Sequence, residues 1–134
     1  MGLVVDTSAL VAILKAEPEA SAIADMLASS SIYASNVTLF ELHSVTIRSA
    51  GVIDPQAAAS LLENLEISPV EFDAQQLAAA LSAYARYGRG TKHPAQLNIG
   101  DCFAYALART RNLPLLFKGE DFIHTDIVPA LKPA

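Results

Sequence analysis

The 134-residue chain has few of the residues that build disulfide scaffolds, zinc sites or membrane spans. Its one cysteine, Cys102, excludes an internal disulfide and fits a reducing compartment, so we expect a cytoplasmic protein. The histidines, His43, His93 and His124, stand at no metal-ligand spacing from one another or from Cys102. No apolar run approaches the ~20 residues of a membrane-spanning helix. The first residues also lack the basic region of a signal peptide.

Positive charge is scarce as well. Nine Lys and Arg residues face 14 Asp and Glu residues, which gives a formal net charge of -5. This balance excludes a protein that coats nucleic acid through net charge alone. It does not exclude a nuclease, because acids gathered in one metal site would account for the imbalance. The apolar fraction of 52% suits helices packed closely on a sheet and leaves room for an apolar oligomer face.

Short strand candidates alternate with helix candidates along the chain. Pro69 places the third of the strands at a sheet edge. Asn36, Asp54 and Asp73 are expected N-caps. We expect strands at 3–5, 32–34, 67–72 and 115–117, and helices at 9–14, 20–27, 37–49, 54–65, 73–87 and 98–111. The alternation with short connections predicts one α/β domain over residues 1–134, with a mainly parallel sheet.

Asp6 follows the strand 3–5 directly and precedes a helix. Taken alone, the Asp-Thr pair favours an ordinary helix cap. A buried parallel strand that ends in an acid, however, delivers that acid to the sheet edge where ligands bind in α/β proteins. The two interpretations do not compete if Thr7 or Ser8 takes over the cap. Other carboxylates arriving at the same edge would favour a ligand site.

Three further acids occupy unusual positions. Glu41 lies among apolar residues in the first turns of a helix, although an exposed stripe beside Thr38 and Ser44 is an alternative. Asp101 is the acid in the first turn of an otherwise apolar helix, and a dipole effect of ~0.3–1 kcal/mol does not explain that placement. Asp121 follows the strand 115–117 by a short turn, in the same layout as Asp6.

Carboxylates from four segments are therefore able to lie together at one sheet edge. Ionised together, they would raise one another's pKa unless a counter-charge were present. Oxygen ligands select hard cations such as Mg²⁺ or Mn²⁺. Carboxylate-held cations with open positions are typical machinery for phosphodiester hydrolysis.

Basic residues gather in one loop and beside one strand. The side chains are Arg86, Arg89, Lys92 and His93, with Lys118 and Arg109 further along the chain. Contacts from such residues to RNA phosphates position a substrate without reading its sequence. The alternative is a solvated loop. Tyr84, Tyr87 and Tyr105 are candidates for base stacking, with core or interface packing favoured for Tyr84 and Tyr105.

Four segments together resemble the PIN domain and, more narrowly, the VapC toxins of bacterial type II toxin–antitoxin pairs. These segments are VVDTSAL (4–10), LFEL (39–42), GDCFAYALA (100–108) and LLFKGEDF (115–122). The resemblance covers essentially the whole chain. It implies a three-layer sandwich and an endoribonuclease that depends on Mg²⁺ or Mn²⁺. It also implies an RNA substrate, a VapB-like antitoxin and a homodimer.

Carried over by position, Asp6, Glu41 and Asp101 match the three strict acids of the family and are the expected catalytic and metal-binding residues. Relatives often show Gly-Asp-x-Asp-Phe at the fourth place, which residues 119–122 shorten to Gly-Glu-Asp-Phe. We take Asp121 as the fourth acid, with Glu120 and Asp126 as alternatives. Asp126 and the hydroxyl of Thr7 are accessory candidates. Ser8 and Thr125 are similarly expected to orient an acid or a bound water, or to serve as turn formers.

Two other functions fit parts of the pattern. A receiver-like phosphoacceptor domain would use Lys118 after its last strand, but the paired acids after the first strand are missing. A catalytically silent PIN-like interaction module would lose acids, and the three strict positions keep theirs. The alanine-rich stretches at 20–28 and 57–62 offer a surface for a second copy or an antitoxin helix.

Overall fold

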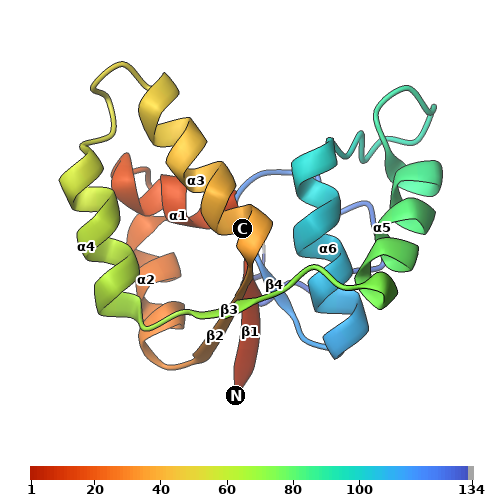
Figure 1. Cartoon of the computed structure of the whole chain (residues 1–134), viewed down its shortest axis with the longest axis horizontal. Coiled ribbons are helices and arrows are strands. Elements are labelled where there is room, and N and C mark those ends of the chain that lie inside the picture. Colours follow the sequence, from red (N-terminus) through yellow and green to blue (C-terminus); the bar gives the residue numbers. More distant parts are fainter. Residues whose placement is uncertain (133–134) are drawn as a thin grey trace.

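The structure is a computed structural model that describes residues 1–132. Strands and helices alternate along the chain (Figure 1), as the sequence predicts. In chain order the elements are β1 (Gly2–Val5), α1 (Thr7–Leu14), α2 (Ala20–Ala28), β2 (Ser31–Ser35), α3 (Asn36–Arg48), α4 (Pro55–Leu65), β3 (Ser68–Val70), α5 (Ala74–Tyr87), α6 (Ile99–Arg111) and β4 (Leu115–Leu116).

The four strands form a parallel sheet in the order β3-β2-β1-β4. Pro69 lies on β3, which is an edge strand as predicted. The chain builds outward from β1 through β2 to β3, and then crosses by α5 and α6 to place β4 on the other side of β1. The strand order therefore reverses beside β1. In open α/β sheets, ligands bind at such a switch point, outside the carboxyl ends of the strands.

Helices cover both faces of the sheet, with α1 to α4 on one side and α5 and α6 on the other (Figure 1). Alternate residues of β1 point to opposite faces. Leu3 and Val5 pack in the cluster that contains Leu10 of α1, whereas Val4 packs in the cluster that contains Leu107 of α6. The near-continuous apolar sequence of β1 follows from burial on both faces. The expected three-layer sandwich is confirmed.

Some boundaries differ from the sequence-based expectations. β3 is shorter than the predicted 67–72. The N-cap of α3 is Ser35 and not Asn36, because β2 ends at Ser35 and its hydroxyl accepts a hydrogen bond from the Val37 backbone N–H at 3.1 Å. Asp54 and Asp73 cap α4 and α5 as predicted. Within residues 1–132, no helix combines the length and hydropathy needed to cross a bilayer.

Candidate active site

Asp6 lies at the carboxyl end of β1 and is 4% exposed. Its Oδ2 accepts hydrogen bonds from the Ser8 backbone N–H at 3.1 Å and from the Ser8 hydroxyl at 2.6 Å. Asp6 is therefore itself the N-cap of α1, and the expectation that Thr7 or Ser8 would take over the cap is wrong. The Ser8 Oγ also accepts from the Lys118 backbone N–H at 3.0 Å. Ser8 thus connects Asp6 to the segment that follows β4.

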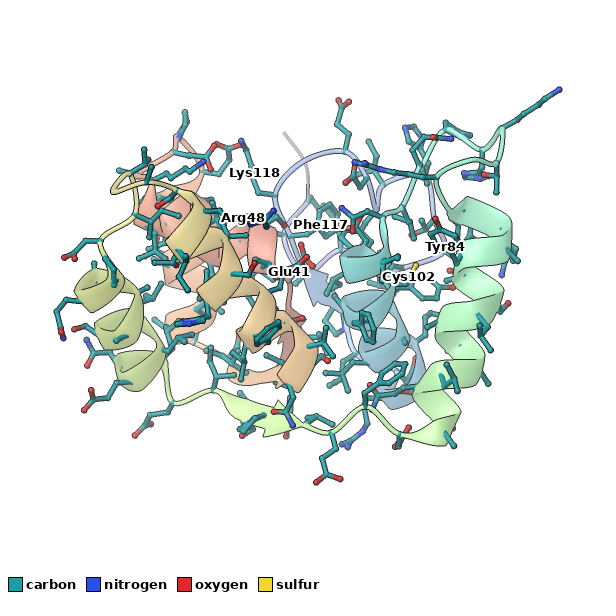
Figure 2. All side chains as sticks on the ribbon, turned by 45° about the horizontal axis from the view of Figure 1, so that its top comes forward. Glu41, Arg48, Tyr84, Cys102, Phe117 and Lys118 are labelled. Atoms are coloured by element: carbon teal, nitrogen blue, oxygen red, sulfur yellow. The ribbon has the colours of Figure 1, made fainter. Side chains whose placement is uncertain are left out.

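Glu41 comes from α3 and reaches across to the start of α6 (Figure 2). Its Oε1 accepts a hydrogen bond from the Thr7 hydroxyl at 2.5 Å. A Cβ built on Gly100 would overlap its Oε2, so the carboxylate rests where that glycine leaves space. The alternative of an exposed stripe is wrong, because Thr38 is buried and Glu41 is half-buried.

Asp101 lies in the first turn of α6 and is 9% exposed. It forms a capping box with Asn98: the Asp101 backbone N–H donates to Asn98 Oδ1 at 2.8 Å, and Asp101 Oδ2 accepts from the Asn98 backbone N–H at 3.0 Å. The capping box fixes the carboxylate at the helix N-terminus. Between Asp101 and Arg109, α6 is mostly apolar because this part of the helix packs against the sheet and α5.

Burial raises the pKa of both central carboxyls. The pKa of Asp6 rises from 3.8 to about 6, mainly through desolvation and with a contribution from the charge of Glu41, while the hydrogen bonds from Ser8 oppose the rise. The pKa of Asp101 rises to about 7, again mainly through desolvation, with the charges of Asp6, Asp121 and Glu41 adding to it. Asp101 therefore lies within electrostatic range of Asp6, Asp121 and Glu41.

Asp121 and Asp126 have different surroundings. Asp121 is exposed beside the buried Phe122, and its charge helps raise the pKa of Asp101. Asp126 instead accepts a hydrogen bond from the Tyr105 hydroxyl at 2.6 Å and pairs with Arg109 Nε at 3.6 Å. These contacts favour Asp121 over Asp126 as the fourth acid.

Of the three hydroxyls expected to orient acids, two contact an acid and one contacts only the backbone. Thr7 holds Glu41, and Ser8 holds Asp6. Thr125 donates to the Phe122 carbonyl at 2.7 Å and accepts from the Ile127 backbone N–H at 3.2 Å, so it shapes the turn instead.

The four acids offer only carboxylate oxygens to a cation. Within the described part of the chain, no three acidic, histidine or cysteine side chains converge closely enough to ligate one ion directly. Mg²⁺ commonly keeps several waters and takes only one or two carboxylates from the protein. The acid set therefore fits a hydrated hard cation better than a fully dehydrated one.

The basic side chains expected to contact RNA have different surroundings. Lys118 Nζ pairs with Glu17 at 2.7 Å, and this contact raises the pKa of Lys118. Arg89 and Lys92 are exposed in the loop between α5 and α6. Arg86 instead faces a groove between α5 and α6.

The tyrosines also have different surroundings. Tyr84 is 39% exposed, whereas Tyr87 and Tyr105 are buried in the core.

Sequence reasoning missed Gly100 as part of the site. The available signal was a glycine inside a helix, where alanine is favoured by roughly 1 kcal/mol, so that glycine indicates close approach of another group. Thr38 was also missed; its buried Oγ1 has no hydrogen-bond partner within residues 1–132, and its carbonyl lies 3.5 Å from the Thr7 hydroxyl.

A parallel sheet flanked by helices, with acids from four segments at its switch point, defines an α/β domain with an acidic site. The chain belongs to the PIN domain family, whose model matches residues 3–128, and within it to the VapC ribonuclease toxins. This membership removes the receiver-like alternative.

The relatives support this assignment over nearly the whole chain. Ribonuclease VapC28 of Mycobacterium tuberculosis is 42% identical over 137 residues, which cover 96% of this chain and 98% of that protein. Ribonuclease VapC of Mycolicibacterium smegmatis is 41% identical over 126 residues, with 93% and 97% covered. The crystal structure of M. tuberculosis VapC20, described as a sarcin–ricin loop cleaving toxin, has the same fold. It matches with a TM-score of 0.71 and 19% identity, covering 98% of this chain and 100% of that one.

Proposed function

We propose that this protein is an endoribonuclease dependent on Mg²⁺ or Mn²⁺ and the toxin of a VapBC-type pair. The observation that carries the proposal is the burial of Asp6 and Asp101 at one sheet edge, with pKa values raised to about 6 and about 7 and with Glu41 and Asp121 in electrostatic range. Like charges held together in this way are costly unless a cation binds. Relatives at about 40% identity are ribonucleases by name, which supports the activity.

In this proposal Asp6, Asp101 and Asp121 hold the cation, and Glu41 positions the attacking water or holds a second ion. A bound divalent cation lowers the pKa of a water and offsets the charge that develops on the phosphate. Thr7 keeps Glu41 in place through its hydroxyl, and the bond that Ser8 donates keeps Asp6 oriented.

The exposed Arg89 and Lys92 are proposed to contact RNA phosphates. Lys118 is three residues before Asp121 in the chain. To bind a phosphate, its ammonium would have to leave the carboxylate of Glu17. Both side chains of this pair are partly open to solvent, which screens their attraction, so the exchange is inexpensive.

A cavity of ≈ 420 Å³ beside the acids supports the proposed antitoxin contact. Ala22 and Ile23 of α2 line it, together with residues 117–120 after β4. An apolar antitoxin segment seated there would carry a basic side chain to the carboxylates. The expected homodimer is supported by large exposed apolar side chains elsewhere, on α3 (Phe40 and Ile47) and on α5 (Leu77 and Leu81).

The proposal is tested with purified protein and end-labelled RNA. We expect cleavage with Mg²⁺ or Mn²⁺, none in EDTA, and none by Asp6→Asn or Asp101→Asn, because amides cannot replace the anionic ligands. Asp54→Asn is the matched control, because Asp54 is the exposed N-cap of α4 and is not one of the four proposed site acids. Metal-independent cleavage, or normal cleavage by Asp101→Asn, would overturn the proposal. A protein that cleaves no RNA but still binds an antitoxin would be the silent PIN-like module.

A further inference from the structure

A polar groove of ≈ 380 Å³ lies between α5 and α6, which run side by side in the helical layer opposite α1 to α4 (Figure 1). Residues of α5 line it at spacings of four, three and four, so they share one face of the helix. At 1.5 Å per residue this wall is about 16 Å long, and much of it is exposed. The lining consists of Gln75, Ala79, Ser82 and Arg86 from α5 and Tyr105, Arg109 and Thr110 from α6. A wall of this length suits a linear ligand.

The charge of this groove is opposite to that of the whole chain. Its charged lining residues are Arg86 on one wall and Arg109 on the other, in a protein of net charge -5. Arg109 pairs with Asp126 at 3.6 Å, with side chains 48% and 36% exposed. Solvent screens an exposed pair of this kind, so Arg109 can turn to another anion at small cost.

The guanidinium of Arg86 is oriented by its neighbour Tyr87 and still has donors for an anion. Its Nη2 donates to the Tyr87 hydroxyl at 2.6 Å, and its guanidinium carbon lies 4.7 Å from the centre of the Tyr87 ring. Within residues 1–132 these contacts leave other N–H donors of the guanidinium free of protein partners, and a planar guanidinium matches phosphate oxygens in pairs. Ser82 and Gln75 add neutral hydrogen-bonding groups along the same wall.

We propose that the α5–α6 groove binds the phosphodiester backbone of single-stranded RNA away from the bond that is cut. This inference rests on the proposed ribonuclease function. Asp101 and Arg109 lie on the same helix, eight residues or about 12 Å apart along its axis, so one strand has to be longer than a dinucleotide to engage both. Contacts to phosphates there add affinity without reading sequence. The groove therefore makes binding depend on RNA length.

The test is binding of fluorescently labelled RNA oligonucleotides of about 4 and about 16 nucleotides, measured by anisotropy in EDTA. We expect Arg86→Gln to weaken binding of the longer RNA about tenfold and to leave the shorter one unchanged. The salt slope should fall by about 0.7 for each phosphate that the variant no longer neutralises. Arg111→Gln is the control, because Arg111 is exposed in the same helix end as Arg109 but lies outside the groove.

A second variant retains the Arg86 side chain but gives its guanidinium a competing carboxylate. Ser82→Glu places a carboxylate one turn from Arg86 and opposes a phosphate; Ala78→Glu adds the same charge at an exposed site of α5 outside the groove. Only the first should remove the length dependence. The inference is overturned if Ser82→Glu and Ala78→Glu lose the same affinity for the longer RNA. It is also overturned if Ser82→Glu and Arg86→Gln bind that RNA like the wild type, or if polyaspartate displaces the longer RNA as well as unlabelled RNA does. Cleavage in Mg²⁺ is scored separately, so absence of cleavage counts against the proposed function and not against the groove.

Discussion

Replacing Asp101 by Asn is expected to stabilise the metal-free protein while it removes the proposed activity. Asp101 has a pKa of about 7 in the folded chain and an ordinary value of 3.8. The folded state therefore holds the proton more tightly than the unfolded state does. The resulting penalty on folding is absent below about pH 4, grows as the pH rises, and is complete above about pH 7. An asparagine cannot ionise, and its side-chain oxygen still accepts the hydrogen bond from the Asn98 backbone N–H that Asp101 accepts now.

The size of the gain follows from the shift. About three pKa units correspond to roughly 4 kcal/mol at 1.36 kcal/mol per unit. Structural relaxation and water entry offset part of this penalty, so we expect the free energy of unfolding to rise by about 2 kcal/mol near pH 8. For a domain of this size the melting temperature should rise by about 8 °C.

Urea denaturation of both proteins in EDTA, at about pH 4, 6 and 8, measures the effect. The difference should vanish near pH 4 and be largest near pH 8. Asp54→Asn is the control, because it changes an exposed N-cap and should show no such gain at any of these pH values. Destabilisation by Asp101→Asn near pH 8, or a gain of equal size near pH 4, would contradict a folding penalty that arises from ionised Asp101.

Three further predictions concern the same edge of the sheet. Millimolar Mg²⁺ should raise the melting temperature of the wild type by several degrees at about pH 8 but not that of Asp6→Asn, as scanning fluorimetry can show; equal shifts would exclude Asp6 as a ligand. Gly100→Ala should displace the Glu41 carboxylate and reduce cleavage about tenfold or more with a stability change under about 1 kcal/mol; full activity would mean that Glu41 has no fixed role. Asp121→Asn should reduce cleavage and leave the melting temperature unchanged. Asp126→Asn should lower the free energy of unfolding by about 1 kcal/mol, because its hydrogen bond to Tyr105 is weaker, and should leave stabilisation by the metal intact. The reverse pattern would make Asp126 the fourth acid.

Much of the architecture could be predicted from local patterns. The apolar run of β1, the Pro at N1 of α4 and the Asp caps of α4 and α5 act over a few residues, so the sequence reveals them directly. The α3 cap was misassigned because Ser35 and Asn36 are neighbouring residues with similar cap preference, and only the end of β2 decides between them. β3 is short because an edge strand with Pro69 offers few donors for pairing.

Local sequence patterns are enough to predict the alternation of strands and helices, the acid after β1, the acid in the first turn of α6 and the resemblance to a family. The tertiary structure decided which side chains meet. Thr7 and Glu41 are 34 positions apart, and Ser8 and the Lys118 backbone N–H are 110 apart. It also decided that Asp126 bonds to Tyr105 and that Gly100 makes room for Glu41. Propensities and caps act within a helical turn, whereas these contacts depend on the strand order that brings β4 beside β1.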